Sequence, residues 1–228
     1  MKKKLELTLD QAQSIYKTAD AGLKEILEAN FGKTNLIGRP IGVWCLTDNN
    51  QAIKAEDWRN QYRCIGVGVV TDKTAFIVSL VPQAALPFGS TNVEEYDDVV
   101  YATESYDNAA ATYCIIEAHE DEVGKMWNND KFPFKGAPAA EYCVKQGGAL
   151  PTLATAKEIA ANIKDINEAM MAVGGAVVCG WLWTSTVQKS NNCAFVVSTY
   201  YGYVYDETRS LNNHARAVSA FRFEDFKF

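Results

Sequence analysis

The spacing of hydrophobic residues changes repeatedly along this chain, between the period of an amphipathic helix and the short apolar runs of strands. Residues 5–31 and 154–173 carry apolar side chains at helical spacing. Residues 64–70 and 75–81 are apolar, β-branched runs separated by the turn-forming stretch 71–74, which is typical of a hairpin. Helical and strand patterns follow one another to the end of the chain. This mixed order predicts an α+β fold.

The first helical pattern predicts a small N-terminal element over residues 1–34, ahead of a larger domain over 35–228. Thr8 and Gln11 have the spacing of a capping box, and Asp20 to Gly22 interrupts the apolar stripe, so we expect two short helices that end at Gly32. Such a pair is too small to hold a core alone. We therefore expect it to pack on the rest of the chain or to join helices of another subunit.

The larger domain contains further helical and strand patterns. The long pattern over 154–173 predicts one continuous helix. Two further helices are predicted over 109–122 and 138–146. The predicted strands are 41–46, 193–199, 202–205 and 215–223.

The charge balance excludes one class of partner. The net charge is -6 and the isoelectric point is about 5.1, whereas nucleic-acid binding needs a basic stripe that neutralises phosphates. No stretch has the length and apolar character of a transmembrane helix, so we expect no membrane insertion. The positive residues at the start are not followed by the apolar region of a signal peptide. We therefore expect synthesis in a cytoplasm without export by that route.

The six cysteines are far apart in the sequence and none forms a C-x-x-C pair. Zinc and redox sites usually show such short spacings, so no metal or cofactor is predicted. Apolar neighbours favour buried, reduced thiols. The cysteines are Cys45, Cys64, Cys114, Cys143, Cys179 and Cys193.

The segment from Thr184 to Asn213 has an unusual composition. Of its 30 residues, 16 are Ser, Thr, Asn or Tyr, and only four are charged. Ser, Asn and Tyr together provide adaptable hydrogen bonds and rigid amphipathic contact area, as in antibody paratopes. Ordinary surface hairpins have a related composition, because Asn and Ser favour turns and Tyr favours strands. Both interpretations stay open from composition alone.

The order of several short motifs is more specific than this composition. The chain carries Cys-Ile-Gly-Val at 64–67, Pro-Ala-Ala-Glu-Tyr-Cys at 138–143, Trp-Thr-Ser-Thr at 183–186 and Arg-Ala-Val-Ser-Ala-Phe at 216–221. Their order resembles that of the C-type-lectin-like proteins of gut Bacteroidales and their phages, relatives of the formylglycine-generating-enzyme fold. The resemblance implies a C-type-lectin-like domain with short strands and two flanking helices, preceded by the helical element.

The C-terminal half is similar to the variable proteins of diversity-generating retroelements, whose best-known members are receptor-binding proteins of phage tails. The resemblance implies a non-enzymatic protein in the virion that binds a host-surface protein or glycan, with residues 1–34 contacting other virion subunits or copies of itself. It implies a scaffold of Trp181, Trp183, Arg216 and Phe221. The implied solvent-facing, ligand-binding residues are Ser190, Asn191, Asn192, Ser198, Thr199, Tyr200, Tyr201, Tyr203, Tyr205, Asp206, Asn212, Asn213 and His214.

In such systems a reverse transcriptase randomises Asn codons, which yields Ser, Thr, Tyr, Asp or His but not Lys, Glu or Gln. Gln188, Lys189 and Glu207 are then expected to be constant positions. Two alternatives remain: an invariant lectin-like binding or structural protein in the bacterial cytoplasm or at the cell surface, and an enzyme of the formylglycine-generating type that uses Cys179 and Cys193. The second is disfavoured, because neither cysteine has a nearby cysteine partner in the sequence.

Other motifs give weaker signals. Residues 127–130 resemble the Trp-Asn-Asp calcium motif of true C-type lectins, but the accompanying triplet of oxygen ligands is missing. His119 lies in an acidic run that predicts a solvated helix face, and His214 is expected at an exposed edge. Gly66 and Gly68 lie inside a strand pattern without a third glycine, so they indicate close packing or a bulge, not a dinucleotide site.

Overall fold

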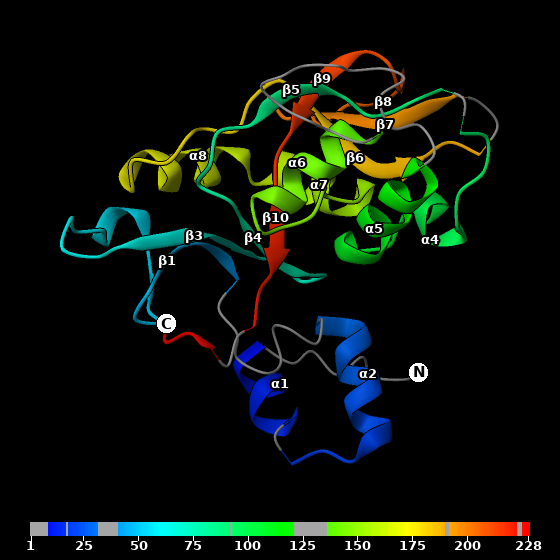
Figure 1. The fold of residues 1–228 in the computed structure, drawn as a ribbon. Coiled ribbons are helices and arrows are strands. Elements are labelled where there is room, and N and C mark those ends of the chain that lie inside the picture. Colours follow the sequence, from blue (N-terminus) through cyan, green and yellow to red (C-terminus); the bar gives the residue numbers. More distant parts are fainter. Residues whose placement is uncertain are drawn as a thin grey trace.

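In a computed structural model, the described part of the chain is mixed α+β, as predicted, with two five-stranded sheets and helices packed against them (Figure 1). Its described residues are 9–16, 18–31, 41–91, 93–120, 136–189, 192–222 and 225–228.

The first sheet is antiparallel throughout and has the strand order β10-β4-β3-β1-β2. The predicted β3–β4 hairpin is confirmed, and the Thr71 amide donates to the Thr74 carbonyl at 2.8 Å to close its turn. The second strand ends three residues earlier than predicted, because the Ser79 hydroxyl accepts a bond from the Val81 amide and turns the chain. The strands are β1 (Gly42–Thr47), β2 (Ala52–Ile53), β3 (Cys64–Val70), β4 (Ala75–Val78) and β10 (Val218–Ala220).

The second sheet has the order β5-β9-β6-β7-β8, so β8 lies at its outer edge. Strands β6 and β9 meet in parallel at Leu182 and His214, and the other pairs are antiparallel. The strands are β5 (Ala84–Pro87), β6 (Trp181–Val187), β7 (Cys193–Ser198), β8 (Val204–Thr208) and β9 (Asn212–Ala215).

The predicted strand over 215–223 is wrong as a single element. Strand β9 ends at Ala215 in the second sheet, and β10 begins at Val218 in the first, so two buried residues carry the chain between the sheets (red in Figure 1). The Ala217 carbonyl accepts the Ser79 amide at 3.0 Å. This crossing joins the two sheets through the backbone.

The helices of the larger domain pack against both sheets. One core cluster joins α5 and α6 to Phe88 and Trp183, and another joins α7 and α8 to the inner face of the first sheet. Side chains of Asp107 and Thr152 cap α5 and α7 by accepting amides three residues later, at 3.0 and 3.3 Å. The helices are α4 (Asp98–Tyr101), α5 (Asn108–Ala118), α6 (Pro138–Lys145), α7 (Leu153–Ala161) and α8 (Ile163–Ala172), with a short 3-10 turn η1 (Ala55–Asp57).

The predicted helix over 138–146 is confirmed, whereas the one over 154–173 is interrupted. Asn162 separates α7 from α8 at φ -108°, and its side-chain amide donates to the Glu158 carbonyl at 2.9 Å. This local bond competes with regular helix geometry. Ile159 and Ile166 remain buried in the same core cluster, so the amphipathic stripe is correct although the helix is divided.

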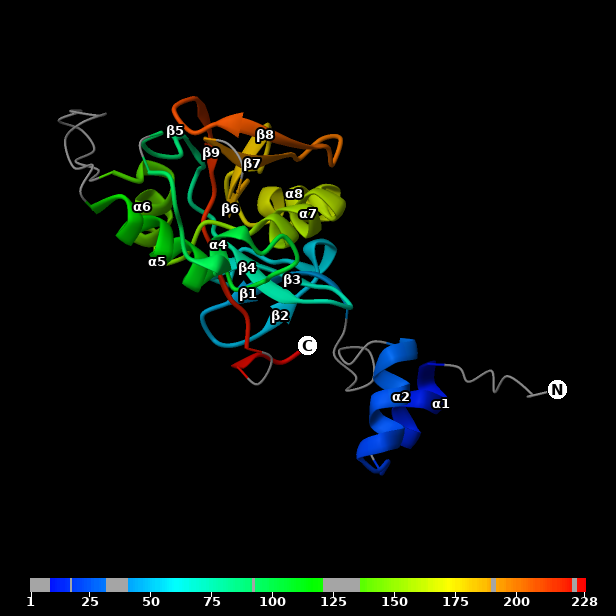
Figure 2. The ribbon, with the colours of Figure 1, turned by 90° about the vertical axis from the view of Figure 1, so that its right-hand side faces the viewer.

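The N-terminal helices α1 (Leu9–Tyr16) and α2 (Ala21–Phe31) form a hairpin that lies apart from the two sheets in both views (Figures 1 and 2). Asp20 begins α2 by accepting the Leu23 amide at 2.9 Å, which confirms the predicted interruption between the helices. Thr8 and Gly32, the expected cap and stop, lie outside the described residues. The hairpin has a small apolar cluster of its own around Ala12, Tyr16 and Leu27.

Close packing explains the two glycines of β3. A Cβ atom on Gly68 would lie 3.0 Å from carbon atoms of both Leu46 and Phe221, and a Cβ on Gly66 would lie 2.3 Å from Ile77. Glycine therefore lets side chains of neighbouring strands approach the β3 backbone.

We expect Gly68→Ala to lower the free energy of unfolding by about 1–3 kcal/mol, because the added methyl overpacks a filled space. Denaturant unfolding measures this loss. Gly22→Ala is the matched control: it adds the same methyl in ordinary contact within a helix, where alanine is favoured over glycine. Equal stability of Gly68→Ala and the unmodified chain would contradict the packing explanation.

Candidate recognition surface

The turn between β7 and β8 is held by backbone hydrogen bonds. The Ser198 amide donates to the Tyr203 carbonyl at 2.9 Å, and the Gly202 amide donates to the Ser198 carbonyl at 2.8 Å. Gly202 has φ +70°, a left-handed conformation that glycine adopts without strain. The hairpin therefore presents residues 199–203 in one defined conformation.

Ser198 and Thr199 do not face solvent, which corrects the expectation for these two residues. Their exposed fractions are 5% and 2%. The Ser198 hydroxyl accepts the Tyr201 amide at 3.3 Å, and the Thr199 amide and hydroxyl both donate to the Gly180 carbonyl at 3.0 Å. Buried polar groups need such partners, so Ser198 closes the turn internally and Thr199 fastens it to the start of β6.

Four tyrosines project from this fastened turn and from β8. Tyr200, Tyr201, Tyr203 and Tyr205 are 81%, 65%, 59% and 57% exposed. Adjacent rings contact one another: Tyr200 meets Tyr201 edge to face at 4.6 Å, and Tyr201 stacks on Tyr203 at 5.5 Å between centroids. Such aromatic pairs restrict each other without burying the rings. The four rings form one exposed aromatic patch.

A shallow cleft of about 380 Å³ lies beside these rings, and its lining includes Tyr201, Tyr203, Tyr205, Asp206 and Glu207. Trp181 forms one wall and meets Tyr205 edge to face at 5.3 Å. Trp181 was expected only as scaffold, yet it is half-buried and contributes to the exposed site. We call the four tyrosines together with Trp181 the tyrosine surface. Exposed apolar patches of this kind mark interaction sites.

The remaining predicted residues lie in two other places. Asn192 is exposed at the start of β7, and Asn212 is exposed at the start of β9, whereas Asn213 and His214 are half-buried along β9. Strands β6 and β7 separate β9 from β8, so β9 is not part of the tyrosine surface. Ser190 and Asn191 lie outside the described residues.

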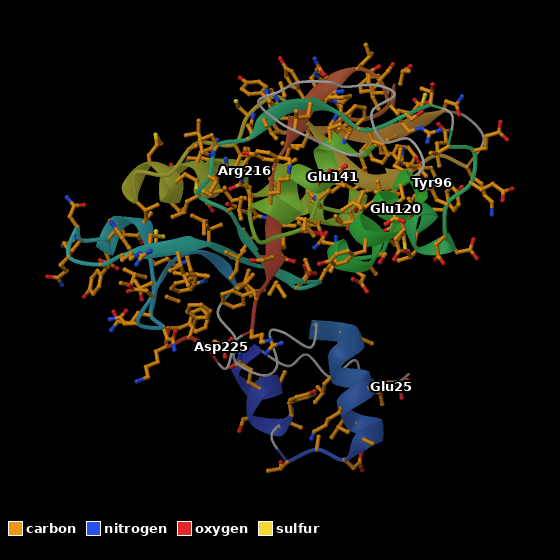
Figure 3. The ribbon with its side chains drawn as sticks, viewed as in Figure 1. Glu25, Tyr96, Glu120, Glu141, Arg216 and Asp225 are labelled. Atoms are coloured by element: carbon orange, nitrogen blue, oxygen red, sulfur yellow. The ribbon has the colours of Figure 1, made fainter. Side chains whose placement is uncertain are left out.

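The predicted scaffold residues other than Trp181 are buried. The Trp183 indole donates to the Leu86 carbonyl at 2.8 Å, and Phe221 stacks on Phe226 at 5.2 Å. Arg216, labelled in Figure 3, donates to the Ala176 carbonyl at 2.7 Å. Burial lowers the pKa of its guanidinium to about 10, because the charged form loses solvation.

A buried polar network around Arg209 was missed by the sequence reasoning. The guanidinium of Arg209 donates to the Tyr96 hydroxyl, to the Val93 carbonyl at 2.8 Å and to the Asn192 side chain at 2.9 Å. Burial raises the pKa of Tyr96 to about 12, opposed in part by the nearby Arg209 charge. A lone arginine in a polar segment gave no signal of these distant partners. The network anchors the end of β8 to the segment before α4.

His119 is buried, not on a solvated helix face as predicted. Its Nδ1 lies 2.8 Å from the Ile115 carbonyl oxygen, and its ring packs beside Phe88 and Tyr96. Its position at the C-terminal end of α5, against Phe88 and Tyr96, decided its environment. The acidic neighbours in the sequence gave no indication of this burial.

All six cysteines are free. Cys45 and Cys143 are buried as expected, whereas Cys179 is exposed and the other three are half-buried, which corrects the expectation of six buried thiols. Burial raises the pKa of the Cys45 thiol to about 12 and also raises the pKa of Cys193, so both favour the protonated form. The calcium-like motif at 127–130 lies outside the described residues.

Partial burial lowers the pKa of His214, whose imidazole packs on the backbone of Gly180. As the pH falls through the ordinary histidine value, the unfolded chain takes up this proton before the folded one, so stability decreases. We expect His214→Asn to show a smaller loss of melting temperature between about pH 7 and pH 5. Thermal unfolding at both pH values measures this, and an unchanged loss would refute it.

The described residues contain neither a helix long and apolar enough to cross a membrane nor a group of three or more His, Cys, Asp or Glu placed to hold a metal ion. Comparisons of the chain with protein-family models, curated proteins and solved structures find no match.

Proposed function

We propose that this chain is a non-enzymatic receptor-binding protein with a C-type-lectin-like domain, a variable protein of a diversity-generating retroelement that acts in a phage virion. The observation that carries the proposal is the tyrosine surface. Three of its exposed rings contact one another on a turn fastened by buried hydrogen bonds, and the fourth, Tyr205, contacts Trp181. Tyrosine provides large contact area at low entropic cost. The receptor is a protein or glycan on the host surface.

The division between buried and exposed positions supports a surface that tolerates sequence change. The tyrosines and Asp206 are exposed, and Asn codons can mutate to encode each of them. The frame beneath is made by backbone bonds and by buried groups such as Trp183. Exchange of exposed side chains on such a frame leaves the fold intact, because loops and edges carry few core contacts.

The helical hairpin supplies an attachment element in this proposal. Leu23 and Ile26 are 40% and 60% exposed on α2, one helical turn apart. Apolar residues at this spacing favour contact with another helix. We assign the hairpin to contacts with other virion subunits or with copies of the same chain.

Replacement of all four tyrosines by alanine tests the proposed surface. Because the rings are mostly exposed, we expect a melting temperature within about 2 °C of the unmodified chain, but loss of binding to intact host cells. Labelled protein and a panel of gut Bacteroidales strains provide the measurement.

Tyr113→Ala is the matched control, since Tyr113 is 56% exposed on α5, away from the tyrosine surface. It should bind like the unmodified chain. Retained binding by the fourfold variant, or collapse of its fold, would refute the assignment of these rings.

The genomic neighbourhood tests diversification separately. We expect a reverse-transcriptase gene next to a near-copy of codons 180–221 that differs from the gene only at adenines. Sequencing of the source locus decides this. A locus without these two features would leave an invariant lectin-like binding protein in place of a diversified one.

A further inference from the structure

Hydrogen bonds at both ends of the β7–β8 ladder determine which way the backbone of β8 points. At one end the Ser198 amide donates to the Tyr203 carbonyl, and at the other the Arg209 amide donates to the Asn192 carbonyl at 3.4 Å. In antiparallel pairs, hydrogen-bonded and non-hydrogen-bonded positions alternate. The odd-numbered residues of β8 therefore bond to β7.

The even-numbered residues of β8 direct their backbone groups to the outer edge of the sheet. Val204 and Thr208 are the first and last of them, and both are exposed. The Leu211 amide donates to the Thr208 carbonyl at 3.0 Å, which agrees with this outward direction. Among the described residues, no strand pairs with β8 on its outer side. An outward N–H row of this kind is a template for another strand.

Two members of the tyrosine surface follow the same period of two: Tyr205 lies on β8 and Tyr203 directly precedes that strand. Tyr203 and Tyr205 project to one face of β8, and the cleft of about 380 Å³ with its Trp181 wall lies beside them. A strand added to the edge presents every second side chain to that face. Aromatic or aliphatic side chains at those positions would fill the cleft.

Carboxylates gather at the opposite end of β8. Arg209, which follows Thr208, bonds to the Tyr96 hydroxyl, and Tyr96 lines a polar cleft of about 460 Å³ with Glu94, Glu95 and Asp98. Lys189 is the one basic residue among those lining this cleft. The three carboxylates outnumber the two cations at this end, Lys189 and the buried Arg209, so a basic side chain on an added strand is attracted there.

We propose that β8 is a docking edge for an extended polypeptide segment of a protein receptor, which adds a sixth strand to the second sheet. The segment carries alternating aromatic or aliphatic side chains for the tyrosine surface and a Lys or Arg toward the acidic end. The proposal rests on the proposed receptor-binding function and selects a polypeptide as the ligand class. Backbone bonds supply affinity and the cleft supplies selectivity, as in other strand additions.

Proline substitution at both ends of β8 removes two of its three outward N–H groups, those of Val204 and Thr208, and leaves the ladder to β7 intact. Val204→Pro with Thr208→Pro is the test variant, because proline is tolerated at edge positions whose N–H faces solvent. Val204→Ala with Thr208→Ala is the matched control, which keeps both N–H groups. Circular dichroism and thermal unfolding establish that each variant is folded.

The probe is a displayed library of random 12-residue peptides selected on the full chain. We expect selected peptides to alternate apolar and polar residues and to carry a basic end. Their affinity should fall by about tenfold or more for the proline variant and by less than about threefold for the alanine control.

N-methylation of a selected peptide tests the pairing without any change to the protein. Methyl groups on alternate backbone nitrogens should abolish binding, and those on the intervening nitrogens should have little effect, because only every second N–H faces β8. Uniform sensitivity along the peptide, or none, would overturn the proposal. This scan decides the matter if the proline variant does not fold.

The remaining outcomes separate this proposal from the proposed function. Failure to select peptides, together with glycan-array binding that needs the tyrosines but not the outward N–H groups, overturns strand addition and retains receptor binding. Dimerisation of the full chain that the proline variant abolishes would show that β8 pairs with a second copy instead. If the fourfold tyrosine variant still binds both host cells and the selected peptides, the proposed function and the strand addition are both overturned.

Discussion

The crossing from β9 to β10 joins the two sheets on which the rest of the larger domain is packed. Arg216 and Ala217 are buried between the two sheets, where Ala217 accepts the Ser79 amide. Val218 then exchanges backbone bonds with Ala149 at 2.8 and 2.9 Å, which joins the connection between α6 and α7 to the first sheet. Backbone hydrogen bonds therefore connect the crossing to Ser79, which directly follows β4, and to the segment between α6 and α7. The strand pairs that carry the tyrosine surface depend on this arrangement.

The frame and the exposed rings have separate physical roles. The hydroxyls of Ser198 and Thr199 hold the turn by hydrogen bonds to backbone groups of Tyr201 and Gly180. Arg209 fixes the far end of β8 through its bond to Tyr96. The tyrosine rings contribute little to these contacts. Rigid backbone and exposed aromatic side chains together lower the entropic cost of binding, because the contact area is arranged before the partner arrives.

Much of the secondary structure could be predicted, because periodicity is a local property. The β3–β4 hairpin, α6 and the two N-terminal helices follow directly from apolar spacing and turn residues. The division at Asn162 could not, since it accompanies a side-chain bond to the Glu158 carbonyl that apolar spacing does not reveal. The separation of β9 from β10 could not either, since it depends on how the two sheets pack. His119 was misjudged for the same reason: its neighbours in sequence are acidic, but its neighbours in space are Phe88 and Tyr96.

By itself the sequence determined that the tail is rich in tyrosine and small polar residues and that apolar runs flank it, because composition and period are written in the chain. Only the tertiary structure decided which of those residues face solvent. Thr199 and Tyr200 are adjacent, yet one is buried and the other is 81% exposed. A turn directs neighbouring side chains to opposite sides, and the partners of buried hydroxyls, such as the Gly180 carbonyl, come from distant positions in the chain.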